Sequence, residues 1–295
     1  WRALRTPREL AAEAGLPEPS RASACEAVSL PGLLQEAEVS ELLVLGREVR
    51  ATGRATVFRT GESALASVHS RELGGASAQA RSEWSTTYLH AGHEFQRRLP
   101  NLHSRLLRAA RAVDAEHWGI CAAAAAAARS AEAGLPGVAE TCLPCSEAPI
   151  SARTIELHEV LAGGALPQRD HHDSGSCVTI DVMLSRPGID FDGGAVEFPT
   201  STDAAAPALE STPRFELGDA LIFPSHKHHC VHPVLWGVRR VLVIELWCGE
   251  ERSCPHRCQQ HFGACTWALR GLGFGPQCLM HWLEASMAEH HDCPW

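Results

Sequence analysis

The sequence predicts an α+β protein with a jelly-roll core (a double-stranded β-helix), amino-terminal helices packed on one outer face and a cysteine-rich carboxy-terminal tail. Two amphipathic helical patterns precede residue 150, and seven or eight short β-rich runs follow it. Six of the twelve cysteines lie in the last 48 residues. The expected regions are therefore a loosely attached lead-in (1–24), a helical support region (25–149), the jelly-roll core (150–250) and the tail (251–295).

The helices are predicted from the spacing of apolar residues. From Ala27 the sequence indicates a short strand, and a helix then follows. Its broad apolar stripe consists of Leu33, Leu34, Val39, Leu42, Leu43 and Leu45. A second helix is expected over residues 99–119. The residues spaced to share its buried face are Leu102, Leu106, Leu107, Ala110 and Val113. An alanine tract at 121–134 favours helix by propensity but offers little to pack, and we assign it no function.

The strands are predicted from short runs rich in β-branched and aromatic residues. These runs are TIELHEVL, CVTIDVMLS, GGAVEFP, RFEL, ALIFPS, HCVHPVL and RRVLVIELW, and the turn signals AGG, RPGIDFDGG, LGD and WG separate them. We expect Gly193 and Gly194 to form a tight turn or bulge before AVEF. Turns are also expected at 218–219 and 236–237.

Composition argues against two kinds of partner. The formal net charge is −9 and the only lysine is Lys227, so the chain lacks the clustered positive charge that nucleic-acid binding requires. No apolar run approaches the roughly 20 residues that span a bilayer. Because the sequence opens with Trp1 and not methionine, we expect it to be a piece of a longer chain, with any targeting peptide outside it.

The cysteines of the tail leave three alternatives open. Disulfides are one reading, a structural zinc site that uses His256, His261 or His281 is a second, and plain thiols are a third. Cys142 and Cys145 form CLPC, but no strand precedes them and no helix follows, so we expect a local disulfide or two buried thiols.

A metal site is predicted from residues in two distant segments. The stretch RDHHDSGS contains His171 and Asp173, and residues two apart in an extended segment project to the same side. His229 lies 56 residues after Asp173, in a different predicted strand, and supplies a third ligand. Two imidazoles and one carboxylate form a facial triad that suits Fe(II), because three coordination positions stay open. Zinc is the alternative metal for this ligand set.

The neighbouring histidines are expected to play no part in the metal site. His172 should point outward from the His-x-Asp pair, and His232 has the opposite parity from His229. His226 and His228 precede the strand and are expected to be solvated loop residues at the rim.

Four motifs resemble those of the 2-oxoglutarate- and Fe(II)-dependent oxygenases, in particular the prolyl 4-hydroxylase and procollagen lysyl hydroxylase group. They are HHD (171–173), FDGGAVEFP (191–199), LGDALIFPS (217–225) and HCVHPVLWGVRR (229–240), in matched order within about 100 residues, from Arg153 to Trp247. The resemblance implies that His171, Asp173 and His229 hold iron and that Arg239 clamps the distal carboxylate of 2-oxoglutarate. An arginine fork suits this task because it offers a carboxylate two parallel hydrogen bonds. Arg240 is expected on the opposite face, as a surface charge.

Two positions depart from the pattern of that family. Where prolyl hydroxylases place a tyrosine and a threonine that help to hold the cosubstrate, this chain has Val160 and Val196. Thr179 or His158 is expected to substitute for them in cosubstrate binding.

The implied activity is that of a 2-oxoglutarate-dependent dioxygenase that hydroxylates a peptidyl prolyl or lysyl side chain. Its cofactors would be Fe(II), 2-oxoglutarate and dioxygen, with ascorbate as reductant, and its partner a protein or peptide substrate. Residues 74–90 and 200–214 are candidate lids. A small-molecule hydroxylase and a non-catalytic metal-binding jelly roll are the alternatives. The cysteines and the resemblance together favour the ER lumen or the secretory pathway.

Overall fold

The described part of the chain, in a computed structural model, comprises residues 26–51, 58–59, 84–124, 150–199, 209–210 and 215–258. The expected lead-in, most of the alanine tract, the CLPC pair and the tail beyond residue 258 lie outside these residues. No helix among the described residues is both long and apolar enough to cross a membrane.

The amino-terminal region contains the two predicted helices. Helix α3 (Glu36–Ala51) follows strand β1 (Val28–Leu30), and helix α6 (Pro100–His117) follows the short helices η1 (Ala91–His93) and α5 (Glu94–Arg98). Proline is well placed at the start of α6, because the first turn of a helix has no internal partner for its N–H groups. The predicted stripe of α6 is confirmed: the buried residues include Leu102, Leu106, Ala110 and Val113.

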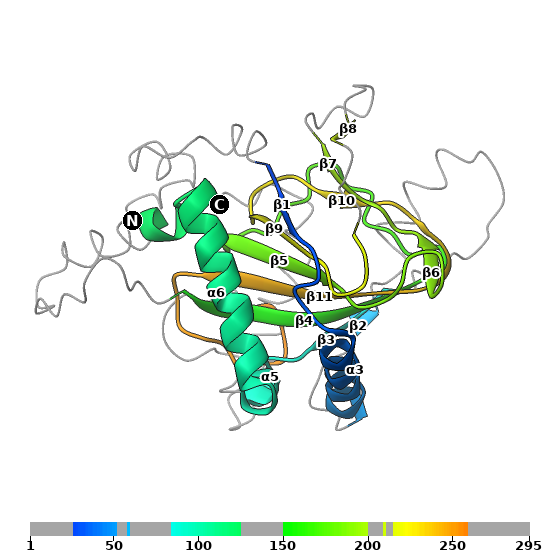
Figure 1. Cartoon of the computed structure of the whole chain (residues 1–295), viewed down its shortest axis with the longest axis horizontal. Helices are drawn as coiled ribbons and strands as arrows, with labels where there is room; N and C mark the ends of the chain where they lie inside the picture. The colour runs from blue at the N-terminus through cyan, green and yellow to red at the C-terminus, as the bar shows by residue number, and fades with distance from the viewer. Residues whose placement is uncertain are drawn as a thin grey trace, which may run out of the picture.

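The core consists of antiparallel strands. They are β4 (Ser151–Leu161), β5 (Val178–Met183), β6 (Phe191–Gly193), β7 (Val196–Pro199), β8 (Leu209–Glu210), β9 (Ala220–Pro224), β10 (Cys230–Val231) and β11 (Val234–Trp247). The main sheet has the order β1-β9-β5-β11-β4-β3-β2, with β6 paired to β11, and a smaller sheet has the order β10-β7-β8. The two sheets form the predicted jelly roll, with the smaller sheet above one side of the main sheet (Figure 1).

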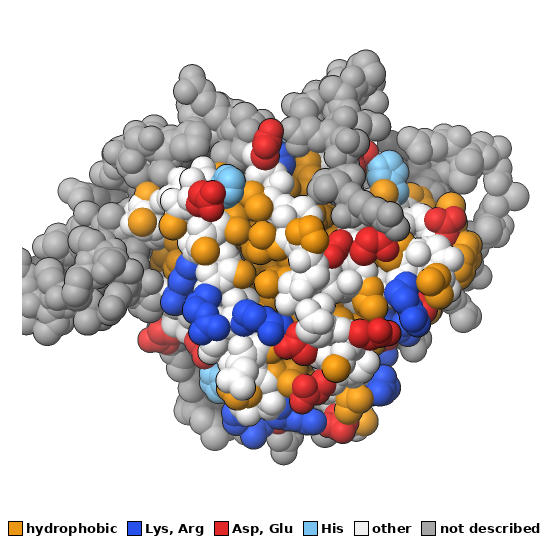
Figure 2. Space-filling view, viewed as in Figure 1, with side chains coloured by type: hydrophobic (Ala, Val, Ile, Leu, Met, Phe, Trp, Pro, Cys, Tyr) orange, Lys and Arg blue, Asp and Glu red, His pale blue; other side chains and the backbone are white. Residues whose placement is uncertain are grey.

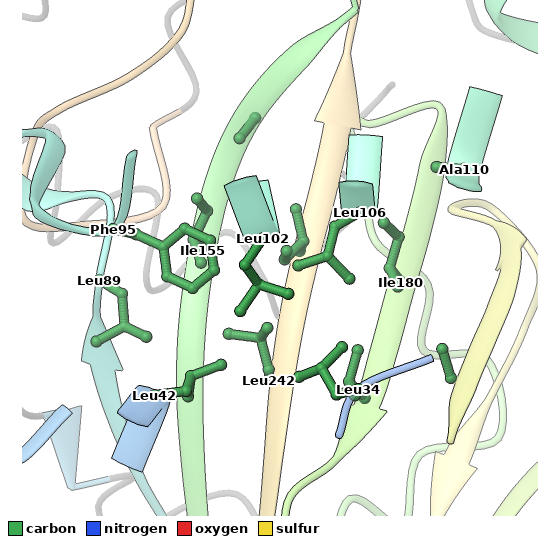
Figure 3. Close-up of a cluster of buried hydrophobic side chains, with 14 of the residues drawn as sticks. Leu34, Leu42, Leu89, Phe95, Leu102, Leu106, Ala110, Ile155, Ile180 and Leu242 are labelled. Atoms are coloured by element: carbon green, nitrogen blue, oxygen red, sulfur yellow. The ribbon is translucent and has the colours of Figure 1, made fainter. Parts of the chain in front are cut away.

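The helices cover one face of the main sheet, as predicted. Apolar side chains of α6 point toward those of the central strands, with Leu102 and Leu106 close to Leu242 and Ile180 (Figure 3). Helix α3 lies close to the sheet at Gly46, where a Cβ atom would overlap the Leu157 side chain. On the solvent side of these helices, positive and negative side chains are interspersed (Figure 2).

The opposite face of the main sheet looks into the jelly roll and mixes apolar with polar side chains. The apolar set is Val160, Met183, Phe191, Val196, Phe198, Phe215, Leu221, Phe223, Val231, Val234, Val241 and Val243. Between them, on the same face by strand alternation, lie Thr179 and Asp181 of β5 and Arg239 and Glu245 of β11. The interior is therefore unusually rich in buried charge for a protein core.

Strand β3 (Trp84–Tyr88) was not predicted. Together with β1 and β2 (Phe58–Arg59), it shows that the region expected to be helical also supplies strands to the main sheet. Because β3 pairs with β4 along five residues, the end of the proposed lid at 74–90 is part of the sheet, and that part of the prediction is wrong. In the second proposed lid, residues 209–210 form β8, which pairs with β7. Residues 74–83 lie outside the described part.

Two strand boundaries also differ from the prediction. Trp236 and Gly237 do not form a turn: β11 runs through them without a break and pairs there with β6 across an irregular register. The reason is that Gly237, with φ of 78°, accommodates the close approach of β6 within a continuing strand. Residues 215–217 of RFEL form no strand and lead into the turn at Gly218. Gly193 and Gly194, where a turn or bulge was predicted, lie at the junction of β6 and β7, and both have positive φ.

Candidate metal centre

His171, Asp173 and His229 converge at one end of the jelly-roll interior. Each offers one ligand atom, and these three atoms lie within 4.8 Å of one another. The His171 Nε2 atom is 3.6 Å from Asp173 Oδ1, and the His229 Nε2 atom is 4.0 Å from Asp173 Oδ2. Two imidazole nitrogens and one carboxylate oxygen in this arrangement fit a single divalent ion with an open side.

Backbone hydrogen bonds bring these distant segments together. The His229 amide donates to the carbonyl of His171 (2.9 Å), and the Asp173 amide donates to the carbonyl of Ser225 at the end of β9 (2.7 Å). These two backbone hydrogen bonds therefore join the loop after β9 directly to the His-x-Asp segment. The side chains of His171 and Asp173, two positions apart in that segment, reach the same point as the His229 side chain.

Neighbouring groups hold two of the three side chains in place. The His229 Nδ1 atom lies 3.0 Å from the carbonyl of Lys227, so the Nδ1–H tautomer leaves Nε2 with a lone pair. The Thr179 hydroxyl donates to Asp173 Oδ2 (2.7 Å) and lies 2.9 Å from the Ser225 hydroxyl. Thr179 thus contacts the carboxylate of the triad.

The protonation states of the triad suit a metal ligand. Burial lowers the pKa of His229 to about 4, against the opposing charge of Asp173, so its imidazole is neutral at neutral pH. Burial disfavours ionised Asp173, but His229, His171 and Arg257 outweigh burial and lower the pKa of this carboxyl below its ordinary value. Metal ions bind neutral imidazole and ionised carboxylate.

An arginine from the tail enters the site, which sequence reasoning did not predict. The Arg257 Nη2 atom lies 3.2 Å from Asp173 Oδ1 and 2.8 Å from Glu245 Oε1. The Glu245 carboxylate is in turn 3.4 Å from Arg153 Nη1 and accepts a hydrogen bond from the Ser176 hydroxyl (2.7 Å). The Asp173 carboxylate is therefore the end of a buried charge network that includes the first residues of the tail.

Arg239 lies in the interior of the core, as its position on β11 predicts. Its side chain is buried, and its Nε and Nη2 atoms have no hydrogen-bond partner among the described residues. Burial lowers the pKa of Arg239 to about 10, which leaves the guanidinium charged at neutral pH. A buried guanidinium with free donors is the expected partner of a buried anion.

Asp181 is a buried acid between the two sites just described. Burial and the charge of Asp173 raise its pKa to about 7, and the charges of Arg239 and His158 oppose this increase. The charge of Asp181 raises the pKa of Arg239 and so opposes the effect of burial. The net charge around Arg239 therefore depends on whether Asp181 is protonated.

His158, an expected aid to cosubstrate binding, belongs to a separate group of contacts. Its Nε2 atom lies 2.7 Å from Glu156 Oε2, and its ring packs edge-on against Trp84 at 5.3 Å. The Glu156 carboxylate also accepts a hydrogen bond from the Thr154 hydroxyl (2.8 Å). Tyr88, the only tyrosine of the chain, stands opposite Glu156 on β3. Strand pairing thus moves this tyrosine, distant in sequence, to the core.

The histidines at the rim are more buried than predicted. His226 and His228 are half-buried instead of solvated, because the loop after β9 folds back over the His-x-Asp segment. The His172 ring lies 5.8 Å from that of His228, while its Nε2 atom faces the Ser174 hydroxyl (3.0 Å).

Two side chains lie away from the triad and from Arg239, as predicted. The His232 side chain is exposed, and its Nε2 atom lies 2.6 Å from Glu197 Oε2. The Arg240 side chain is half-exposed on the other face of β11, where its Nε atom lies 3.0 Å from Glu159 Oε1. These two residues are natural controls for their neighbours His229 and Arg239.

Two buried acids of the site were not predicted, although the sequence pattern indicates their position. Asp181 has the parity of Thr179, and Glu245 has the parity of Arg239, so strand alternation places both inside the core. Arg257 and Tyr88 carried no local signal, since tertiary contacts alone bring them to the site.

Comparisons with known proteins give structural likeness only. No family model matches the sequence, and no curated protein matches it. The structure is similar to that of a viral collagen prolyl hydroxylase from Paramecium Bursaria Chlorella virus-1, with 11% identity, coverage of 75% of this chain and 94% of the other, and a TM-score of 0.42. It is similar to a Pseudomonas putida prolyl-4-hydroxylase, with 14% identity, coverage of 81% and 98%, and a TM-score of 0.41. It is also similar to the epimerase SnoN, in complex with Fe3+, alpha ketoglutarate and nogalamycin RO, with 14% identity, coverage of 84% and 94%, and a TM-score of 0.42.

Proposed function

We propose that this chain is a 2-oxoglutarate- and Fe(II)-dependent dioxygenase that hydroxylates a peptidyl prolyl or lysyl side chain. The observation that carries the proposal is the joint geometry of the interior. Three metal-ligand atoms lie within 4.8 Å of one another, and the same interior contains a buried arginine, Arg239, two of whose nitrogen atoms have no hydrogen-bond partner in the described part of the chain.

The residues present fit a ferrous ion. His171 and His229 supply imidazole nitrogen donors, that of His229 being neutral at neutral pH, and Asp173 supplies an ionised carboxylate. This donor set fits Fe(II), and bound iron with 2-oxoglutarate and dioxygen would supply oxidative decarboxylation of the oxoacid coupled to C–H hydroxylation. Thr179 would orient the Asp173 carboxylate through its 2.7 Å hydrogen bond.

Arg239 fits the distal carboxylate of 2-oxoglutarate. Its side chain is 2% exposed and its Nε and Nη2 atoms lack partners among the described residues, so an anion would satisfy donors that are otherwise buried without acceptors. Val160 and Val196 are both buried in the apolar interior. They would place hydrocarbon, and no hydroxyl group, beside the oxoacid. Arg239 then carries most of the recognition of the distal carboxylate.

Apolar side chains next to the triad would exclude water from the reacting groups. The rings of Phe223 and His229 meet edge-on with centroids 5.1 Å apart, and the Phe198 ring lies 5.1 Å from that of Phe223. A dry wall of this kind suits the oxidation of an unactivated C–H bond, because water competes for reactive intermediates.

The direct test is succinate release from 2-oxoglutarate by the full chain, with Fe(II) and ascorbate. Prolyl and lysyl peptides are compared with the same peptides in which alanine replaces the target residue. We expect peptide-stimulated turnover and one added oxygen atom in the prolyl or lysyl peptide by mass spectrometry. The exposed neighbour His232 gives a matched control: His229→Ala should abolish turnover, and His232→Ala should retain it.

The other outcomes of this assay separate the alternatives. Succinate release that no peptide stimulates would overturn the peptide substrate and favour a small-molecule hydroxylase on the same core. An iron-bound chain that releases no succinate under any condition would contradict the enzyme proposal and favour a metal-binding jelly roll without activity.

A further inference from the structure

A second cluster of metal-ligand side chains lies just after the core, in the first residues of the tail. The ligand atoms of Cys254, His256 and Cys258 lie within 4.8 Å of one another. The Cys-x-His-x-Cys spacing presents three donors from one short segment. We propose that these three residues bind a zinc ion that fixes the start of the tail against the core.

The donor set selects the metal. Two thiolates and one imidazole are soft to borderline ligands that favour Zn²⁺, whereas the His171, Asp173 and His229 set favours Fe(II). Two thiolates and a neutral imidazole around Zn²⁺ carry no net charge, so the complex tolerates burial. The two sites therefore differ in their donor atoms, and of the two only the Cys254, His256 and Cys258 set offers sulfur ligands to a metal.

The spacing of the three donor atoms is compatible with three corners of a tetrahedral zinc site. Zn–S bonds of about 2.3 Å hold two sulfur ligands roughly 3.8 Å apart in a tetrahedron. The three donor atoms, which lie within 4.8 Å of one another, need to approach by about 1 Å at most. Side-chain rotation suffices for such a shift.

Burial of the two cysteines supports a ligand role. Cys254 is 5% exposed and Cys258 is 1% exposed, and among the described residues they form a small cluster separate from both apolar cores. A metal site needs both sulfur atoms in one dry position, and this burial provides it.

The backbone of this segment is held firmly against the core. The Gly92 amide donates to the carbonyl of Ser253 (2.8 Å), and the Arg153 Nε atom donates to the carbonyl of Cys258 (2.7 Å). The His90 Nε2 atom lies 3.2 Å from the carbonyl of His256. Preformed backbone positions reduce the entropy cost of binding a metal ion.

The zinc site would also position Arg257, which stands between two of the proposed ligands. The Arg257 guanidinium contacts Asp173 (3.2 Å) and Glu245 (2.8 Å) of the buried charge network. A zinc ion held by the flanking residues His256 and Cys258 would therefore anchor the arginine that contacts the iron ligand. This consequence rests on the proposed function; the zinc site itself does not.

The test measures zinc bound to the full chain by elemental analysis and native mass spectrometry. In His171→Ala, where the other metal site lacks one ligand, we expect one tightly bound zinc per chain. Cys254→Ser, His256→Ala and Cys258→Ser should each weaken zinc binding by at least about tenfold, since even partners outside the ligand shell cost 10-fold to 100-fold. Cys121→Ser, which alters a buried cysteine of the apolar core, is the matched control and should retain zinc.

Substitution with cobalt gives a measurement on the wild-type chain, so it does not require the cysteine variants to fold. The Co²⁺-substituted wild-type chain should show sulfur-to-cobalt charge-transfer bands and the visible absorption of tetrahedral cobalt. The same bands should persist in His171→Ala and His229→Ala, so failure of the iron site and failure of the zinc site are distinguishable.

Three outcomes would overturn the proposal. They are wild-type chain without bound zinc or cobalt–sulfur bands, cobalt–sulfur bands that survive both Cys254→Ser and Cys258→Ser, and a Cys254–Cys258 disulfide found by peptide mapping of alkylated protein.

Discussion

The Arg257 guanidinium and the Asp173 carboxylate form an ion pair with 3.2 Å between Nη2 and Oδ1. The two residues are 84 positions apart, and the arginine belongs to the tail while the carboxylate belongs to the His-x-Asp segment. A metal ion at Asp173 would therefore share its carboxylate ligand with a fixed positive charge.

Arg257→Gln is expected to strengthen metal binding at the triad. A unit charge about 5 Å from a divalent ion costs on the order of 1 to 2 kcal/mol even at the dielectric constant of water. We expect roughly tenfold tighter Mn²⁺ binding, measured by calorimetry, because 1.4 kcal/mol is a factor of ten. Arg257→Lys retains the charge and should resemble wild type. Weaker binding in Arg257→Gln would mean that Arg257 positions Asp173 for the metal.

Arg239→Ala is expected to weaken the binding of 2-oxoglutarate while metal affinity is retained. Loss of one partner from a buried charge pair costs about 2 to 5 kcal/mol, or roughly 30-fold and more in dissociation constant. Binding is measured by calorimetry with Mn²⁺ in place of iron. Arg240→Ala removes the adjacent arginine from the opposite face and should leave the affinity unchanged. Equal behaviour of the two variants would contradict the role of Arg239.

Gly194→Ala is expected to disturb the same anion site through contact. A Cβ atom at Gly194, which has φ of +63°, would lie 2.6 Å from Arg239 Cδ. Gly32 has nearly the same φ of +61° and open space around it. Gly32→Ala therefore has the same backbone strain of about 1 to 2 kcal/mol but no steric overlap. Only Gly194→Ala should reduce 2-oxoglutarate affinity in the calorimetric assay. A similar loss in Gly32→Ala would indicate a general effect on stability.

Asp181→Asn is expected to stabilise the metal-free protein at high pH. Burial and Asp173 raise the pKa of Asp181 to about 7, well above the value of about 3.9 in unfolded chains. Between these two values the folded state binds more protons than the unfolded state, so stability falls as pH rises from about 4 to 7. The variant removes this loss.

The measurement is the thermal midpoint in chelator at pH 5 and pH 8. The thermal midpoint of Asp181→Asn minus that of wild type should be larger at pH 8 than at pH 5. Asp190→Asn is the control: the Arg186 backbone and side chain lower the pKa of this half-buried carboxyl, so it is ionised in both the folded and unfolded states at these pH values, and the difference from wild type should be nearly the same at pH 5 and pH 8. A pH-independent difference for Asp181→Asn would contradict the raised pKa.

Local sequence patterns predicted the two long helices, most strands of the core and the proposed ligands. Helix α6 follows from the spacing of Leu102 and Leu106, because a helix repeats every 3.6 residues, and strands β4, β5 and β9 follow from their β-rich runs between turns. The pairing of His171 with Asp173 follows from strand parity, and the addition of His229 and Arg239 from the order of four motifs.

Only the tertiary structure decided which distant groups surround those residues. Tyr88 reached the interior because β3 pairs with β4, and Arg257 reached Asp173 because the segment after β11 folds back on the core. The same fold brings together the ligand atoms of Cys254, His256 and Cys258. Sequence periodicity reports the direction of a side chain within its own element. Contacts between elements depend on the packing free energy of the whole chain, which no local pattern encodes.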